Sequence, residues 1–136
     1  MIRDNRELAE RRDLSDISFR VGSPPDLEMG QAFDIVYCMP TLYFVEEVER
    51  AIETLYSHVD AGGYLVFNYP TEATREWLRD ESRRKREFFS PVVSGTTLLT
   101  REALERLLDA DLHDYWAFVG ATELQSPENP AVFVRR

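Results

Sequence analysis

The sequence contains a single cysteine, Cys38, so a disulfide within the chain is impossible. Histidine is almost as scarce, and the two that are present, His58 and His113, stand alone, so we expect no metal site. No apolar run approaches the ~20 residues that a membrane-spanning helix needs. The polar N-terminus does not have the pattern of a signal peptide. We therefore expect a cytoplasmic protein with no metal and no membrane partner.

Lysine is also nearly absent: Lys85 is the only lysine among the 16 lysine and arginine residues. Acidic residues number 25, which gives a net charge of -9. An acidic, arginine-rich composition is typical of a salt-adapted cytoplasm, although a GC-rich genome also favours arginine. The negative field repels polyanions, so nucleic acid is not expected as a partner. The one basic run, residues 79–86, is interrupted by Asp80 and Glu81 and is interpreted as a solvated helix face.

Apolar and aromatic residues are plentiful enough for a packed core. Hydrophobic residues make up 43% of the chain and aromatic residues 12%. The 136 residues suit one domain, and neither an internal repeat nor a low-complexity linker divides them. We therefore treat residues 1–136 as a single unit.

The first half of the chain alternates helices and strands. A polar helix is predicted over residues 3–12, and strands over residues 17–21 and 33–38, where apolar and β-branched residues concentrate. Apolar residues then recur at helical spacing over residues 45–59, and Asp60-Ala61-Gly62-Gly63 offers a glycine to end that helix. Another strand follows at residues 64–69. Two strands joined by a helix predict a right-handed crossover and a parallel sheet.

The second half is more polar. A helix is predicted over residues 72–86, and residues 88–99 are predicted to be irregular. Thr100 is a suitable N-cap for a helix over residues 101–109. The last two strands are predicted at residues 115–120 and 131–134, with a turn at residues 126–130 between them.

The run "ISFRVGSPPDLEMGQAFDIVYCMPTLYFVEEVERAIETLYSHVDAGGYLVFNYP" resembles the middle of class I S-adenosylmethionine-dependent methyltransferases. "FDIVYC" and "DAGGYLVF" lie at the spacing of that family, and "LLTREALERLLDADLHDYW" resembles its last helix and the start of its terminal hairpin. The resemblance implies an α/β fold with a truncated Rossmann-like sheet. That sheet is mostly parallel, with a C-terminal antiparallel strand and with helices on its faces.

The family's main cofactor motif is missing from these residues. Its members carry a Gly-x-Gly-x-Gly loop after the first strand and an acidic residue after the second, and the resemblance puts both before Met1. Gly62 and Gly63 cannot replace the loop, because they follow a helix and precede a strand. We therefore expect a partial methyltransferase domain. Taken alone, it should bind S-adenosylmethionine weakly or not at all and be inactive.

The resemblance implies two groups of site residues. Gly22, Ser23 and Pro24 belong beside the adenine, although Ser23 stands where many relatives have an aspartate and the run is equally a plain turn. The residues beside the sulfonium are, by the same resemblance, Cys38, Met39 and Thr41, although Cys38 and Met39 are also plausible core residues. The residues implied to face the methyl acceptor are Tyr43, Asn68 and Tyr69, of which the two tyrosines are equally believable as core.

No residue is a convincing catalytic base. His58 lies at a helix end away from the expected ligand edge. The sequence Cys38-Met39-Pro40-Thr41 does not match the Asn/Asp-Pro-Pro-Tyr signature of amino-group methyltransferases, which weakens the adenine- and glutamine-methylating alternatives. A small-molecule acceptor is therefore the default expectation.

The family's strand order, 3-2-1-4-5-7-6, has a consequence for this chain. Without strands one and two, the strand at residues 33–38 has an open apolar edge, which native proteins avoid. We expect either that residues 17–21 pair directly with it or that two chains form a homodimer, by pairing across this edge or by exchanging segments. Two alternatives to an active methyltransferase are a catalytically inactive partner or regulatory subunit, and an unrelated flavodoxin-like domain with a different strand order.

Overall fold

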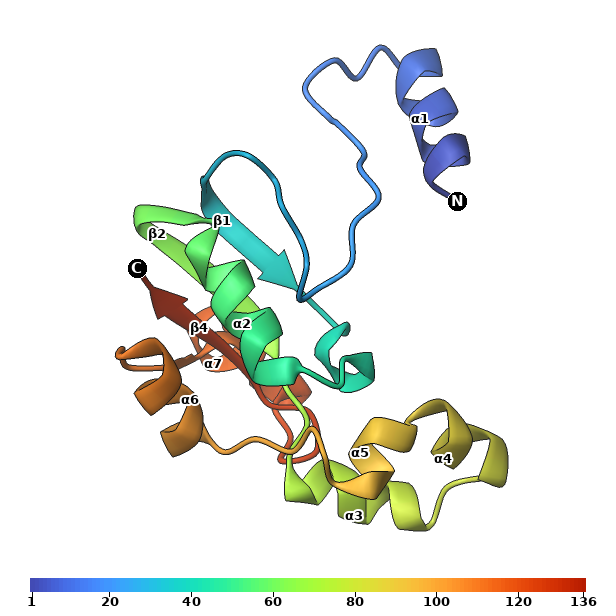
Figure 1. The fold of residues 1–136 in the computed structure, drawn as a ribbon, viewed down its shortest axis with the longest axis vertical. Helices are drawn as coiled ribbons and strands as arrows, with labels where there is room; N and C mark the ends of the chain where they lie inside the picture. Colours follow the sequence, from blue (N-terminus) through green and yellow to red (C-terminus); the bar gives the residue numbers. More distant parts are fainter.

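A computed structural model describes residues 1–136 as a four-stranded sheet with helices around it, and Figure 1 shows this arrangement. The strands are β1 (Phe33–Cys38), β2 (Val59–Asn68), β3 (His113–Asp114) and β4 (Ala131–Arg135). Their order in the sheet is β1-β2-β4-β3. β1 and β2 are parallel, whereas β4 is antiparallel to both β2 and β3. Three strands thus share one direction, and the order equals the 4-5-7-6 part of the expected sheet, so the predicted fold class is confirmed.

One face of the sheet is covered by α2 (Val48–Ser57) and α6 (Arg101–Leu108). Each helix turns an apolar stripe inward, and the inward residues of β2 and β4 meet it. Thr100 caps α6 as predicted, since its hydroxyl accepts a hydrogen bond from the amide of Ala103 at 3.2 Å. The fully buried residues of this main core include Leu42, Ala51, Ile52, Val59, Leu65, Phe67, Leu104 and Val134.

A second, smaller core lies beyond the carboxyl end of β2. It is built by α3 (Glu72–Arg79), α4 (Arg83–Phe88) and α5 (Ser90–Ser94), which group together away from the sheet in Figure 1. The 3₁₀-helix η1 (Leu42–Phe44), which follows β1, packs against α5. The buried residues of this cluster are Tyr43, Leu78 and Val92.

The opposite face of the sheet is only partly covered, by α7 (Tyr115–Phe118) over β4. Ile35 and Tyr37 on β1 are 63% and 56% exposed. α1 (Ile2–Arg11), which the sequence predicted, stands apart from the sheet in Figure 1. No helix of the chain combines the length and the apolar character that a membrane span requires.

The predicted strand at residues 17–21 is wrong. These residues belong to no strand, and Val21 is 82% exposed. The expected pairing of this segment with β1 is wrong as well, because β1 is hydrogen-bonded to β2 alone and its other edge is open. The alternation of apolar and polar residues in this segment does not suffice for a strand, since a strand also needs a neighbour to satisfy its backbone groups.

The first predicted crossover helix is too long at both ends. η1 precedes α2, which begins only at Val48 and ends before His58. Residues 60–63, predicted to end this helix, lie inside β2 instead. Gly62 has φ +82° where the β1–β2 register shifts, and its amide donates to the carbonyl of Arg136 at 2.7 Å. The glycine therefore serves a β-irregularity rather than a helix cap.

Three elements of the second half also differ from the prediction. The helix predicted over residues 72–86 is broken, because Asp80 ends α3 and Ser82 caps α4. The stretch predicted as irregular contains α5, which ends at Gly95 with φ +81°. Tyr115–Phe118 is helical, and β3 precedes it. A helix turn brings Tyr115 beside Tyr37 and Phe118 beside Phe133, at ring distances of 6.0 and 4.9 Å, so tertiary contacts outweigh β-propensity.

Candidate functional site

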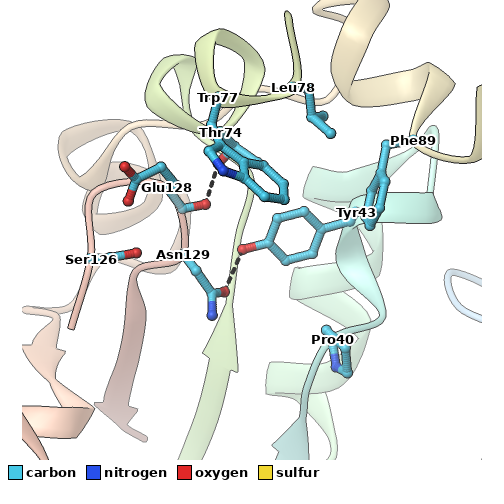
Figure 2. A pocket seen from close by; sticks show the side chains of 9 residues that line it. All are labelled: Pro40, Tyr43, Thr74, Trp77, Leu78, Phe89, Ser126, Glu128 and Asn129. Carbon is cyan, nitrogen blue, oxygen red and sulfur yellow. Dashed lines mark hydrogen bonds between the residues drawn. The ribbon is translucent and has the colours of Figure 1, made fainter. Parts of the chain in front are cut away.

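A cavity of about 440 Å³ lies at the carboxyl ends of β1 and β2. Four parts of the chain line it: the loop after β1, α3, the residue before α5, and the loop that leads into β4 (Figure 2). Open α/β sheets bind ligands at this end of their strands. The lining residues are Pro40, Tyr43, Thr74, Trp77, Leu78, Phe89, Ser126, Glu128 and Asn129.

Aromatic side chains form much of the cavity wall. Tyr43 and Phe89 meet edge to face with ring centres 6.3 Å apart, and Trp77 comes from the facing helix α3. The ammonium of Lys85 lies 3.9 Å from the centre of the Trp77 ring and pairs with Glu81 at 3.0 Å. Such rings offer flat apolar surface and a face that attracts cations.

Asn129 joins the polar side chains behind the wall. Its Oδ1 accepts a hydrogen bond from the Tyr43 hydroxyl at 2.7 Å and one from Asn68 Nδ2 at 2.7 Å. The Tyr43 hydroxyl also lies 3.2 Å from the carbonyl oxygen of Tyr69. Asn68 Oδ1 is buried without a partner. This network ties the ends of β1 and β2 to the loop before β4.

Two threonines of the α3 N-terminus hold the same loop from the other side. Thr71 and Thr74 form a capping box, in which each side chain bonds the other residue's amide. Their hydroxyls also donate outward, from Thr71 to the carbonyl of Pro127 at 2.8 Å and from Thr74 to the carbonyl of Glu128 at 2.6 Å. Figure 2 shows the second of these bonds. The loop that carries Glu128 and Asn129 is thereby fixed on both sides.

The cavity has one ionised group. Hydrogen bonds from its own backbone amide and from Ser126 hold the pKa of Glu128 below its ordinary value, so it is a carboxylate at neutral pH. Burial raises the pKa of Tyr43, which stays a neutral phenol and a hydrogen-bond donor. Burial also raises the pKa of the Cys38 thiol, against the hydrogen bonds of Thr41 that lower it. Neither group is ionised at neutral pH.

The structure brings the three predicted acceptor residues together, but only one reaches the cavity. Tyr43 lines the cavity. Asn68 and Tyr69 are not among the lining residues, and they are only 3% and 5% exposed. Both contribute to the wall indirectly, Asn68 through its bond to Asn129 and Tyr69 through its carbonyl oxygen.

None of the six predicted cofactor residues lines this cavity. Gly22 and Ser23 are exposed in the segment before β1, and the Ser23 hydroxyl bonds the carbonyl of Pro24 at 3.4 Å. Cys38 is buried in the main core at the end of β1. Met39 and Thr41 lie in the loop that follows Cys38, where Met39 is half-buried and Thr41 is exposed.

Sequence reasoning missed Trp77, Glu128 and Asn129. Two local features were present in the sequence but were interpreted as structural. Asn129-Pro130 was assigned to a turn, and Trp77 was placed within a predicted helix. No group of three His, Cys, Asp or Glu side chains could hold a metal ion.

The first part of the chain matches a known protein family. Residues 1–67 match the family model of a methyltransferase domain. No curated protein matches the chain. The matched region runs from α1 through nearly all of β2, so it includes Pro40 and Tyr43, and the other residues that line the cavity lie beyond it.

Proposed function

We propose that the chain is part of a methyltransferase acting on a small molecule held in the cavity, because residues 1–67 match the family model of a methyltransferase domain. S-adenosylmethionine is the usual methyl donor of that family. The observation that carries the proposal is the position of the cavity at the carboxyl ends of two parallel strands, beside the loop that follows β1. The proposal also keeps the cytoplasmic location expected from the sequence.

The described residues fit only part of S-adenosylmethionine. Gly22, Ser23 and Thr41 offer exposed backbone and hydroxyl groups for the adenine and sulfonium sides. A backbone cradle for the methionine end needs glycines in a strand-to-helix turn. The turns after β1 and β2, residues 39–47 and 69–71, contain no glycine. We therefore derive no chemical step through the cofactor and propose that its glycine-rich loop lies outside these 136 residues.

The chain's own residues supply binding and orientation. Trp77, Tyr43 and Phe89 give an apolar wall that excludes water from a bound acceptor, and Asn129 fixes the position of the Tyr43 ring. Methyl transfer is an in-line displacement, in which such positioning supplies most of the protein's contribution. Because Tyr43 and Cys38 both remain protonated at neutral pH, neither is assigned as a catalytic base.

Calorimetric titration with S-adenosylmethionine tests the proposal. The 136-residue chain should give no heat of binding, whereas a protein extended by its upstream reading frame should bind the cofactor and carry a glycine-rich loop. Micromolar affinity of the short chain would overturn the incomplete-site proposal. An upstream frame without such a loop would favour the second candidate, a catalytically inactive methyltransferase-like partner or regulatory subunit, which the glycine-free turns and the open edge of β1 also support.

A further inference from the structure

A second cavity lies against a neighbouring face of α3. Its volume is about 260 Å³, and it lies between α3, α4 and α5, the helices that group together away from the sheet in Figure 1. The residues that line it are Arg75, Leu78, Arg79, Arg86 and Val93. Three of these residues are arginines and none is acidic, so positive charge borders this cavity.

We propose that this second cavity binds a small phosphate-bearing molecule, with the phosphate group among Arg75, Arg79 and Arg86. A guanidinium presents parallel N–H groups that match the oxygens of a phosphate. A phosphate has enough oxygens and charge to meet three guanidinium groups at once, whereas a carboxylate has two oxygens and a single charge. The inference goes beyond the proposed function and does not rest on it, because this binding requires neither a cofactor nor a methyl transfer.

Arg75 is held in position before a ligand arrives. Its Nε donates a hydrogen bond to the carbonyl of Val93 at 3.1 Å, and its Nη1 lies 3.7 Å from a carboxylate oxygen of Glu72. The guanidinium lies against the backbone of Gly95, which has φ +81°, and a Cβ at that position would be 3.3 Å from the guanidinium carbon. A group that is already ordered loses less conformational entropy when it binds a ligand.

Arg79 and Arg86 keep most of their donors free. Arg86 belongs to the basic run that the sequence indicates is a solvated helix face, yet its Nη1 donates to the carbonyl of Arg79 at 3.0 Å, which joins it to the end of α3. The side chain of Arg79 forms neither an intramolecular hydrogen bond nor an ion pair. Two acidic residues nearby, Glu81 and Glu87, pair instead with basic residues that do not line the cavity, at 3.0 and 2.8 Å.

The arrangement favours an anion for electrostatic reasons. Guanidinium groups stay protonated at any ordinary pH, and like charges around one cavity repel one another until an anion lies between them. The net charge of -9 opposes anion binding. At physiological ionic strength, however, the Debye length is about 8 Å, so distant acidic groups are largely screened, whereas the arginines that border the cavity act at contact distance.

Calorimetric titration of the 136-residue chain in a low-salt, phosphate-free buffer at neutral pH tests the inference. Inorganic phosphate and propyl phosphate should both bind, and acetate should bind at least about tenfold more weakly. Tighter binding of propyl phosphate than of inorganic phosphate would identify a phosphomonoester as the ligand, with its organic part against Leu78 and Val93. Equal affinities would identify the free anion, and either result supports the phosphate site.

The matched variants are Arg79→Gln and Arg84→Gln, which remove the same charge. Arg79→Gln should weaken phosphate binding about tenfold, and it should leave the fold unchanged because this side chain has no partner within the chain. Arg84 is exposed on α4 and does not line the cavity, so its variant should keep the affinity of the unmodified chain. Arg75→Lys keeps the charge but loses the fork, so it should also weaken binding.

Three results would each overturn the phosphate site. They are the absence of saturable heat with both phosphate probes, acetate binding as tightly as phosphate, and equal losses of affinity in Arg79→Gln and Arg84→Gln. The last result would show that phosphate responds only to the total charge of the surface. Absence of methyl transfer would count against the proposed function alone.

Discussion

Asn68 and Asn129 are 61 residues apart in sequence, yet Asn68 Nδ2 donates a hydrogen bond of 2.7 Å to Asn129 Oδ1. The bond connects the carboxyl end of β2 to the loop before β4, and the Tyr43 hydroxyl donates to the same oxygen at 2.7 Å. One amide oxygen thus joins three segments around the cavity. Because Asn68 is 3% exposed, water cannot readily replace the bond.

Replacing Asn129 should therefore cost more than an ordinary surface substitution. Asn129→Ala leaves the buried Asn68 amide without its partner, whereas the Tyr43 hydroxyl retains the Tyr69 carbonyl. An unsatisfied buried polar group costs about 1–3 kcal/mol of unfolding free energy, and urea denaturation measures the loss. Gln125→Ala, at an exposed position nearby, should change the unfolding free energy by less than about 0.5 kcal/mol. Equal effects of the two variants would contradict the structural role of the amide.

Two helix caps differ in their other hydrogen bonds, which gives a paired experiment. Thr71→Ala and Thr100→Ala each remove an N-cap, and Thr100→Ala should lower the unfolding free energy by about 1 kcal/mol. Only Thr71 also donates to the loop at Pro127. Thr71→Ala should consequently lower the unfolding free energy by more than Thr100→Ala does. Urea denaturation of both variants measures the difference, and equal losses would argue against the hydrogen bond from Thr71 to Pro127.

Alkaline pH should destabilise the fold. Burial raises the pKa of Cys38 above 9.0 and that of Tyr43 and Tyr69 above 10.0 in the folded state. For groups whose folded pKa is raised, the stabilising contribution is complete below the unfolded pKa and is lost as pH rises toward the folded value. The unfolding free energy should therefore fall from about pH 9 upward, first through Cys38 and then through the tyrosines.

Urea unfolding across this pH range measures the alkaline decline. Tyrosinate absorbance should show that Tyr43 and Tyr69 ionise late or only upon unfolding. Tyr43→Phe should make the upper part of the decline shallower, because it removes one of the shifted groups. Stability that stays flat to well above pH 10 would argue against burial of these three groups.

We further propose that two chains pair through the open edge of β1. The six residues of this strand include one charge, Asp34, and no proline, so the usual protections of an edge strand are missing. In an antiparallel pairing centred on Val36, Ile35 lies opposite Tyr37 of the second copy, which covers two exposed side chains. Asp34 then lies opposite Cys38, so like charges do not oppose each other.

Light scattering after size exclusion tests this pairing. The chain should have the mass of two copies, and Ile35→Lys should shift it to the mass of one. Leu124→Lys, at an exposed position on the 3₁₀-helix η2 (Thr122–Leu124), should leave the dimer intact. A monomer at every concentration, or a dimer that tolerates Ile35→Lys, would rule out the β1 edge as the contact.

Local signals were sufficient to predict most of the sheet and its main helices. β1 was predicted with its observed bounds, and α2 and α6 follow from apolar periodicity and from the Thr100 cap, since these depend on neighbours within a few residues. The cavity depends instead on distant pairs. Asn129 meets Tyr43 across 86 residues, and a sequence read alone does not show that its amide turns toward that ring.

The separation of the two hydrophobic clusters makes one side of the cavity wall, formed by α3 and the residue before α5, exchangeable. Leu78 and Val92 pack in the small cluster with Tyr43, while the sheet, α2 and α6 share a core of their own. A graft that replaced residues 71–98 with a different helical insert would leave that larger core nearly untouched. The residues that contact a ligand from this side could then change within one contiguous stretch, without a second round of optimising the sheet beneath it.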